Sequence, residues 1–465
     1  MDDDIFFAGV TGQAAAIRDG ELSSRELVAA TLERIQRYDG RLNAFTVVLA
    51  DEALAEATAR DATAAGDRGP LHGVPVAIKE EIDVAGSVTT FGGRANVTPA
   101  AADSEVVRRL RAAGAVVVGK TNMPEFGQVP FTDSGAHGIT RNPWDPARSP
   151  GGSSGGSAVA VATGMVPFAL GGDGGGSIRV PASFCGLFGL KPQRGRVTDF
   201  PYEYPWWALA TTGPLTRSVL DSAVVYDAIR GAMPRDRFRA AEPRTSFTEA
   251  ARAEPGRLRI GWWTKAPAVG VRPDPEHVQA VIDTAEALAG LGHQVEEVDP
   301  RYPDATAPFL VQYLGAIRRE AALVEHPELL EGRTRETARL GAWIRPGMVE
   351  WAMRQGEKVA AKANRVFEQY DLLLTPAVAH RPPVAGYVQG LGTVRSLLRS
   401  LPVSAYAALW NVTGNPAASI PTGFARDGLP LAVQLVGRTD DEPTILSVAA
   451  QLERVQPWAE RRPAL

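Results

Sequence analysis

The stretch SPGGSSGGSAVAVATGMVPFALGGDGGGSIRVPASFCGLFGLKP, residues 149–192, decides how the rest of the chain is interpreted. Two glycine- and serine-rich clusters, at 151–157 and 171–177, enclose a short apolar segment. Glycine gives the backbone conformations that other residues avoid and lets it approach a ligand closely. Glycines directly before Ser177 can also aim several backbone N–H groups at one point, as in an oxyanion hole. The stretch therefore indicates a nucleophilic serine at 177 beside its own anion site.

Three other interpretations of this stretch are weaker. Gly/Ser linkers lack apolar residues, whereas apolar segments alternate with the glycines here. The phosphate-binding pattern G-x-x-x-x-G-K-[ST] is absent. The pattern G-x-S-x-G does occur around Ser154, but a nucleophile elbow needs a strand directly before it. Residues 142–150, NPWDPARSP, contain three prolines and cannot form a central strand.

The pieces GGSSGGS (151–157), DGGGSIR (173–179) and CGLFGLKP (185–192) closely resemble the amidase signature family. The resemblance covers a core of about 71–217 and returns from about 365 to 455. It implies a Ser–cis-Ser–Lys triad in which Ser177 is the nucleophile, Ser153 bridges after a cis peptide bond, and Lys79 is the general base. The oxyanion donors that it implies are the N–H groups of Gly174, Gly175, Gly176 and Ser177, with Asp173 and Arg179 bracing the loop.

Two positions depart from the family pattern. Glu80-Glu81 follows the lysine where the family commonly has Asp-Asn, and Gly174 stands where most members have Ile or Thr. A lysine is a base only when neutral, and burial beside the apolar residues VPVAI (74–78) would favour that form. A carboxylate on the same strand face would oppose it. We therefore expect Glu81 to turn away from Lys79.

Strand and helix patterns alternate along the chain and predict an α/β protein. A helix is expected over 23–38, where Ser23 and Glu26 have capping-box spacing, and GVPVAIK (73–79) is expected to be a buried strand. The resemblance implies a single large mixed β-sheet covered by helices on both faces. The triad pieces are spread without a linker, so we expect one domain over 1–465. Its region 233–365 is expected to vary and to shape substrate choice.

The composition excludes several classes of function. The 49 basic and 53 acidic residues are mixed along the chain, so no tract for nucleic acid is expected. No apolar run reaches the ~20 residues of a membrane span. The acidic start MDDDIFF lacks a signal-peptide layout, and a single cysteine, Cys185, suits a reducing compartment; a cytoplasmic protein is expected. The six histidines are scattered, so neither a metal site nor a cofactor is expected.

Aromatic residues crowd the proline-bearing loop TDFPYEYPWWALATTGP (198–214). Aromatics in a loop near a site indicate a pocket for an apolar or aromatic group, although packing against the core is an equally good account of any one of them. The segment TNMPEFG (121–127) resembles a part of the family that lines the substrate cleft. The candidates from this segment, from the residue after it and from the aromatic loop are Met123, Gln128, Tyr204, Trp206 and Trp207.

The predicted function is hydrolysis of a small molecule's C–N acyl bond, other than a peptide bond, through an acyl-enzyme on Ser177. An amide is the leading class, with aryl amides or aryl carbamates (urethanes) favoured and esters as a side activity. One alternative is the glutaminase subunit of a tRNA-dependent amidotransferase. Against it, residues 209–214 read LATTGP where that subunit usually has S-L-D-Q-x-G-P. The other alternative is a non-catalytic ligand-binding member. A monomer or homodimer is expected.

Overall fold

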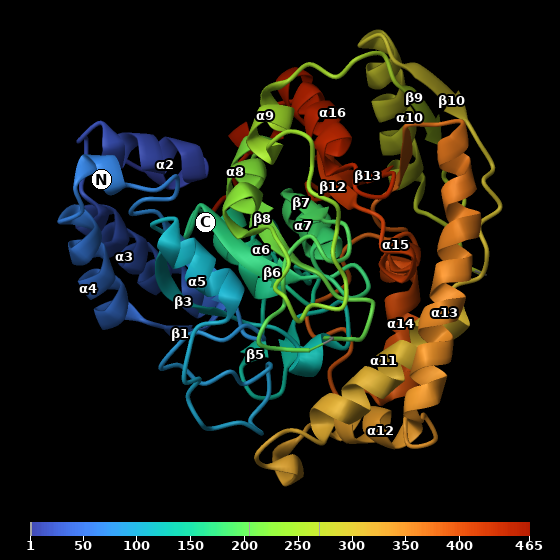
Figure 1. The fold of residues 1–465 in the computed structure, drawn as a ribbon, viewed down its shortest axis with the longest axis horizontal. Coiled ribbons are helices and arrows are strands. Elements are labelled where there is room, and N and C mark those ends of the chain that lie inside the picture. Colours follow the sequence, from blue (N-terminus) through green and yellow to red (C-terminus); the bar gives the residue numbers. More distant parts are fainter. Residues whose placement is uncertain (1, 204, 269) are drawn as a thin grey trace.

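One sheet dominates the computed structural model, which describes residues 2–203, 205–268 and 270–465. Its eleven strands lie in the order β1-β3-β2-β6-β8-β7-β12-β13-β11-β9-β10 (Figure 1). β2 pairs in parallel with β3 and β6, whereas β6 pairs antiparallel with β8. The prediction of a large mixed sheet is confirmed. The strands are β1 (Phe45–Val48), β2 (Pro75–Lys79), β3 (Val116–Thr121), β6 (Phe168–Gly172), β7 (Phe188–Lys191), β8 (Thr212–Thr216), β9 (Arg259–Trp262), β10 (Gln294–Glu297), β11 (Leu372–Pro376), β12 (Ala417–Phe424) and β13 (Pro430–Gly437), with the separate pair β4 (Asp133–Ser134) and β5 (Gly138–Ile139).

Helices cover both faces of the sheet, as the resemblance implied. Successive strand residues point to opposite faces, and in β2 this places Val76 and Ile78 in one apolar core and Ala77 in another. The first core contains α8, α10 and α16, and the second contains α3, α4 and α6. The helices are α1 (Asp4–Phe7), α2 (Gly9–Arg18), α3 (Ser24–Leu42), α4 (Ala50–Asp61), α5 (Glu105–Ala112), α6 (Gly155–Ala162), α7 (Arg179–Cys185), α8 (Val219–Ile229), α9 (Phe247–Arg252), α10 (Pro275–Gly290), α11 (Thr306–Ala321), α12 (Gly332–Leu340), α13 (Pro346–Ala363), α14 (Thr393–Ser404), α15 (Ala408–Thr413) and α16 (Glu442–Val455).

Local sequence signals placed several elements correctly. Ser23 and Glu26 form the predicted capping box at the start of α3. The helix continues beyond the predicted end to Leu42 and stops where Asn43 takes a left-handed backbone conformation with a φ of +54°. The strand predicted to end at Lys79 is β2, which is buried along its whole length. Within the described residues, no helix has both the length and the apolar character to cross a membrane.

The two glycine clusters lie where strands and helices meet. The first leads into α6, and β6 runs into the second, which leads into α7. The region predicted to vary supplies α11, α12 and α13, which pack on one another at one side of the molecule (Figure 1). Strands from both halves of the chain share the one sheet.

Candidate active site

The end of β2 carries Lys79 into contact with the first glycine cluster. Lys79 is 1% exposed, and its Nζ donates a hydrogen bond of 2.8 Å to the Oγ of Ser153. Ser153 lies just before α6, after a cis peptide bond from Gly152, as the resemblance implied. Two residues that are 74 positions apart in the sequence are thereby joined by one hydrogen bond inside the protein.

Ser177 lies in the turn between the second glycine cluster and α7. It is 8% exposed and lines the same cavity as Lys79 and Ser153. The backbone N–H of Ser154 donates to the Ser177 carbonyl at 3.3 Å, which ties the two serine-bearing loops together. The structure therefore brings the three predicted triad residues to one wall.

A buried ion pair fixes the second glycine cluster. The Asp173 carboxylate accepts hydrogen bonds from the Gly176 N–H at 2.8 Å and the Ile178 N–H at 3.1 Å. It also pairs with the Arg179 guanidinium at 2.9 Å and accepts from Asn411 at 2.8 Å. Burial opposes its charge, but Arg179 and these hydrogen bonds outweigh that and hold the pKa of Asp173 well below its usual value. The predicted bracing role of Asp173 and Arg179 is confirmed.

The candidate oxyanion donors differ in their availability. The Gly176 N–H is committed to Asp173, so it is not free to bind a substrate oxygen, which departs from the prediction. Among the described residues, the N–H groups of Gly174, Gly175 and Ser177 have no protein acceptor. Gly176 still has to be glycine, because its φ is +120° and a Cβ there would lie 2.9 Å from the Cβ of Ala407.

The expectation that Glu81 turns away from Lys79 is wrong. Glu81 Oε1 lies 2.9 Å from Lys79 Nζ. The strand ends at Lys79 and a turn follows, closed by a hydrogen bond of 3.0 Å from the Ile82 N–H to the Lys79 carbonyl, and Glu81 lies in this turn beside the lysine. Gly172 leaves room for it, since a Cβ at that position would lie 2.2 Å from Glu81 Oε1. Glu80 points the opposite way and pairs with the buried Lys120 at 3.2 Å. Of the two glutamates, only Glu81 therefore forms an ion pair with Lys79, the candidate base.

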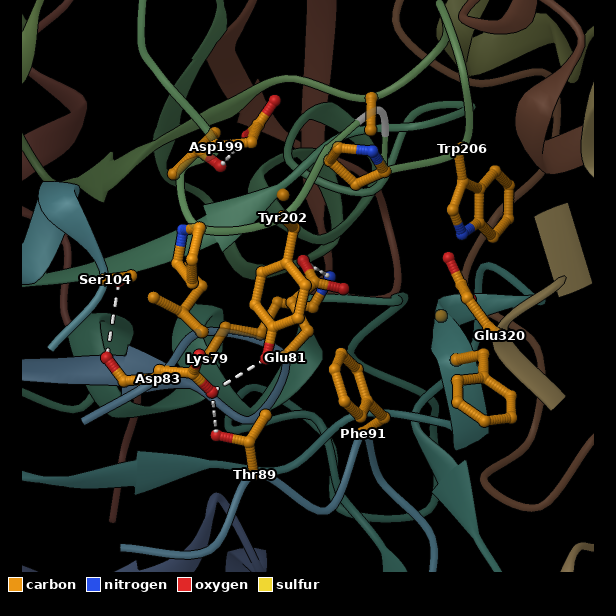
Figure 2. Close-up of a pocket in the computed structure, with 18 of the residues that line it drawn as sticks. Lys79, Glu81, Asp83, Thr89, Phe91, Ser104, Asp199, Tyr202, Trp206 and Glu320 are labelled. Carbon is orange, nitrogen blue, oxygen red and sulfur yellow. Dashed lines mark hydrogen bonds and ion pairs between the residues drawn. The ribbon is translucent and has the colours of Figure 1, made fainter. Parts of the chain in front are cut away.

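A cavity of about 740 Å³ opens in front of Ser177. Figure 2 shows part of its wall, with Tyr202 and Phe91 near Lys79 and Trp206 further along. Such a wall suits an apolar or aromatic substrate group. The aromatic residues that line it are Phe91, Phe126, Phe200, Tyr202, Trp206 and Trp207.

The five predicted pocket residues fall into three groups. Trp206 and Trp207 line the cavity, and Tyr204 lies outside the described residues. Met123 and Gln128 are buried and are not part of the described lining. The Gln128 amide is occupied instead by Thr334 at 2.7 Å and Thr337 at 3.0 Å, which fasten its loop to α12.

Sequence reasoning missed most polar residues of the cavity wall, among them Asp199, Thr211 and Glu320. Burial, Asp236 and Glu81 raise the pKa of Asp199 to about 7 against one hydrogen bond from Thr212. Burial and the charge of Glu81 raise the pKa of Glu320 to about 8. No motif marks these residues, and Glu320 reaches the cavity only through the packing of α11. In the described residues, no group of three or more His, Cys, Asp or Glu side chains could hold a metal ion.

Comparisons with known proteins agree with this geometry. The family model Amidase matches residues 26–446. AmiB2 of Mycobacterium tuberculosis, whose name places it among amidases, is 46% identical over 466 residues that cover 99% of each chain. The solved structure of a 6-aminohexanoate cyclic dimer hydrolase has a TM-score of 0.92 and 34% identity, and covers 98% of this chain and 99% of its own. A bacterial aryl acylamidase of the amidase signature family has a TM-score of 0.87 and 27% identity, with 98% of each chain covered. The chain belongs to the amidase signature family of amidohydrolases.

Proposed function

We propose that this protein hydrolyses aryl amides or aryl carbamates of small molecules through an acyl-enzyme on Ser177, and that it also cleaves matching esters. The observation that carries the proposal is the 2.8 Å hydrogen bond between Lys79 and Ser153 in the wall of a cavity that also exposes Ser177. This arrangement provides a path for one proton from nucleophile to base. The aromatic wall supports an aryl group, and the aryl acylamidase and the cyclic dimer hydrolase show that relatives of this fold act on amides.

The proposed acylation moves one proton in two transfers. Ser177 Oγ attacks the carbonyl carbon while its proton passes to Ser153 Oγ, and the proton of Ser153 passes to neutral Lys79 Nζ. The carbonyl oxygen becomes an oxyanion, to which the N–H groups of Gly174, Gly175 and Ser177 are available. Collapse of the intermediate breaks the C–N bond, and the proton returns through Ser153 to the leaving amine.

Water then completes the reaction. It gives up a proton along the same path, attacks the acyl-enzyme and releases Ser177. An amide yields a carboxylic acid and an amine, and a carbamate yields an alcohol, carbon dioxide and an amine. Protonated Lys79 donates to Ser153, and neutral Lys79 accepts from it, so one contact serves both directions.

The test is a rate comparison of an acetanilide, the matched phenyl carbamate and glutamine with wild type, Ser177→Ala and Lys79→Ala. We expect wild type to cleave the aryl substrates and Ser177→Ala to form no acyl-enzyme. We expect Lys79→Ala to lose about 10²- to 10⁴-fold in acylation at neutral pH. Full activity of either variant would overturn the assignment. Turnover of glutamine alone would favour a glutaminase subunit instead.

A further inference from the structure

The cavity in front of Ser177 is lined by many more acidic than basic side chains. Its lining contains eight acidic and two basic side chains. Three of the acids are paired: Glu81 with Lys79 at 2.9 Å, Asp103 with Arg111 at 3.0 Å, and Asp173 with Arg179 at 2.9 Å. The other five have no ion pair within the described part of the chain, and Arg319 is the one remaining basic residue of the lining; the five are Asp83, Asp199, Glu203, Glu320 and Glu325.

Two carboxylates of this set, Glu320 and the exposed Glu203, make no side-chain hydrogen bond or ion pair to another described residue, and Glu320 is the partly buried one. It lies on the last turn of α11, half-buried, and no hydrogen bond or ion pair joins its side chain to another described residue. Asp83, by contrast, accepts hydrogen bonds from Thr89 at 2.6 Å and Tyr202 at 2.8 Å. The neighbouring Arg319 is held elsewhere, since it lies 5.1 Å above the Trp207 ring and donates to the Glu203 carbonyl at 3.0 Å.

The surroundings of Glu320 suit an organic cation. Figure 2 shows its side chain extending toward Trp206, with Phe91 on the neighbouring part of the wall. Aromatic faces attract ammonium groups, and a half-buried carboxylate without a counter-charge gains most from one. Burial and the charge of Glu81 raise the pKa of Glu320 to about 8 against the charge of Arg319, so a bound ammonium group would favour the carboxylate form of this side chain.

A second, independent feature of the wall also lacks a partner. Thr211 is 5% exposed and lines the same cavity, and its hydroxyl makes no hydrogen bond to any described residue. A buried hydroxyl without a partner is costly, so such groups are normally satisfied by water or a ligand. Its backbone pairs with that of Asp173, which places it beside the candidate oxyanion loop. The Thr211 oxygen is itself buried, so the carboxylate of Glu320 on α11 is the unpartnered group of this wall that a ligand can reach.

We propose that the preferred substrates carry a protonated primary amine and that the Glu320 carboxylate binds this ammonium group between the aromatic side chains. This inference rests on the proposed function and names its substrate class: amides or carbamates that are cationic at one end and apolar in between. Glu320 is then a specificity-determining residue that takes no part in the bond-breaking step.

Two isosteric substrate pairs test the proposal. One pair has the amine on the acyl side: the p-nitroanilides of 6-aminohexanoic acid and of heptanoic acid. The other has it on the leaving group: the acetanilides with a 4-aminomethyl or a 4-ethyl substituent. In each pair an ammonium group replaces a methyl group of similar size, so kcat/KM isolates the charge. The enzymes are wild type, Glu320→Gln and, as a matched control, Glu328→Gln, whose carboxylate lies outside the cavity lining and is 69% exposed.

We expect wild type to favour the cationic member of at least one pair by about 10- to 100-fold, the range of a hydrogen bond to a charged group. Glu320→Gln should lose most of that preference while its rate on the neutral members stays within about twofold, and Glu328→Gln should keep the preference. Equal rates on both members with wild type, or an equal loss on both with Glu320→Gln, would overturn the proposal.

A binding measurement separates failure of this inference from failure of the proposed function. Ser177→Ala is titrated with the same four compounds by calorimetry, alone and combined with Glu320→Gln. If wild type cleaves only the neutral members, the hydrolase proposal stands and the inference is refuted. If wild type cleaves none of them, the hydrolase proposal fails for anilides. The inference is then decided by whether the cationic compounds bind more tightly and lose that advantage with Glu320→Gln.

Discussion

Trp206 occupies the space that a side chain at Gly174 would need. A Cβ built on Gly174 would lie 2.8 Å from Cε3 of Trp206, closer than real Cβ contacts. Gly174 does not require a left-handed backbone, since its φ is outside the positive region. Glycine at position 174 therefore leaves the space that the Trp206 indole fills. The candidate oxyanion loop and the aromatic wall of the cavity pack directly against each other at this point.

This contact predicts a coupled effect on aryl substrates. Gly174→Ala should displace Trp206 and lower kcat/KM for an aryl amide by about tenfold, the range for one methylene in a pocket. The backbone donor remains, so the rate on a small aliphatic ester should change much less. The measurement is a double-mutant cycle with Trp206→Ala. In that background the added methyl group should cost little, and a full additive cost would contradict the contact.

The ion pair between Glu81 and Lys79 predicts an effect of the carboxylate on the rate. The carboxylate attracts the ammonium form of Lys79, which cannot accept a proton from Ser153. Glu81→Gln should therefore raise kcat/KM for an aryl amide by about two- to fivefold, as expected for a partly exposed ion pair worth roughly 0.5–1 kcal/mol. The measurement is kcat/KM of both enzymes at several pH values. A large loss of activity at every pH would instead show that Glu81 holds Lys79 in place.

The raised pKa of the buried Glu125 predicts that the free energy of unfolding falls as the pH rises. Burial, with the charge of Glu331, raises its pKa to about 7 from 4.5 despite the hydrogen bond from Thr334. Between these values the folded protein holds a proton that the unfolded chain has released, so stability decreases with pH across this window. The loss is complete above pH 7 and amounts to roughly 3 kcal/mol at most.

Thermal unfolding at pH 5 and pH 8 checks this expectation. Glu125→Gln should show a smaller difference between the two conditions than wild type, and Glu286→Gln, an exposed position on α10, should match wild type. Other buried acids such as Glu453 also make the stability of every variant depend on pH. The effect of Glu125 is therefore the difference between the variants in how far the melting temperature changes from pH 5 to pH 8. Identical slopes for Glu125→Gln and wild type would contradict the assignment.

The Asp173–Arg179 pair predicts a cost in both stability and rate. Asp173→Asn would leave the Arg179 guanidinium buried without its counter-charge, which typically costs about 3–5 kcal/mol. It would also weaken the bond that fixes the Gly176 N–H, so the neighbouring donors would lose their fixed positions. We expect a lower melting temperature together with a lower kcat for an activated ester. A fall in melting temperature with unchanged kcat would show that the loop keeps its form without the brace.

The catalytic wall could be predicted because short-range sequence patterns determine it. Lys79 ends a buried strand, and both serines follow glycine runs, so the local pattern and the family resemblance agree at these positions. The orientation of Glu81 could not be predicted, because it depends on the absence of a side chain at Gly172, a strand residue 91 positions away. Whether a glutamate turns toward a lysine is decided by such tertiary space rather than by its neighbours in the chain.

The part of the cavity wall that α11 contributes could not be predicted from the sequence for a related reason. Glu320 belongs to an amphipathic helix whose apolar face alone does not say what it packs against. Gln128 shows the converse: it was expected to meet substrate, but Thr334 and Thr337 of α12 take its amide. In both cases a helix from a distant part of the chain set the outcome: Thr334 of α12 lies 206 positions after Gln128, and Glu320 of α11 lies 143 positions after Ser177.

The position of Glu320 on α11, far in the sequence from Lys79, Ser153 and Ser177, has a consequence for how such enzymes diversify. The proposed bond-breaking residues lie between positions 79 and 177, whereas the carboxylate proposed to bind the ammonium group comes from position 320 of the same cavity lining. If both proposals hold, mutation can exchange the recognised chemical group in one part of the gene while the part that encodes the nucleophile, its base and its anion site stays unchanged. A lineage built in this way can acquire new amide or carbamate substrates by small steps, each of which retains a working hydrolase.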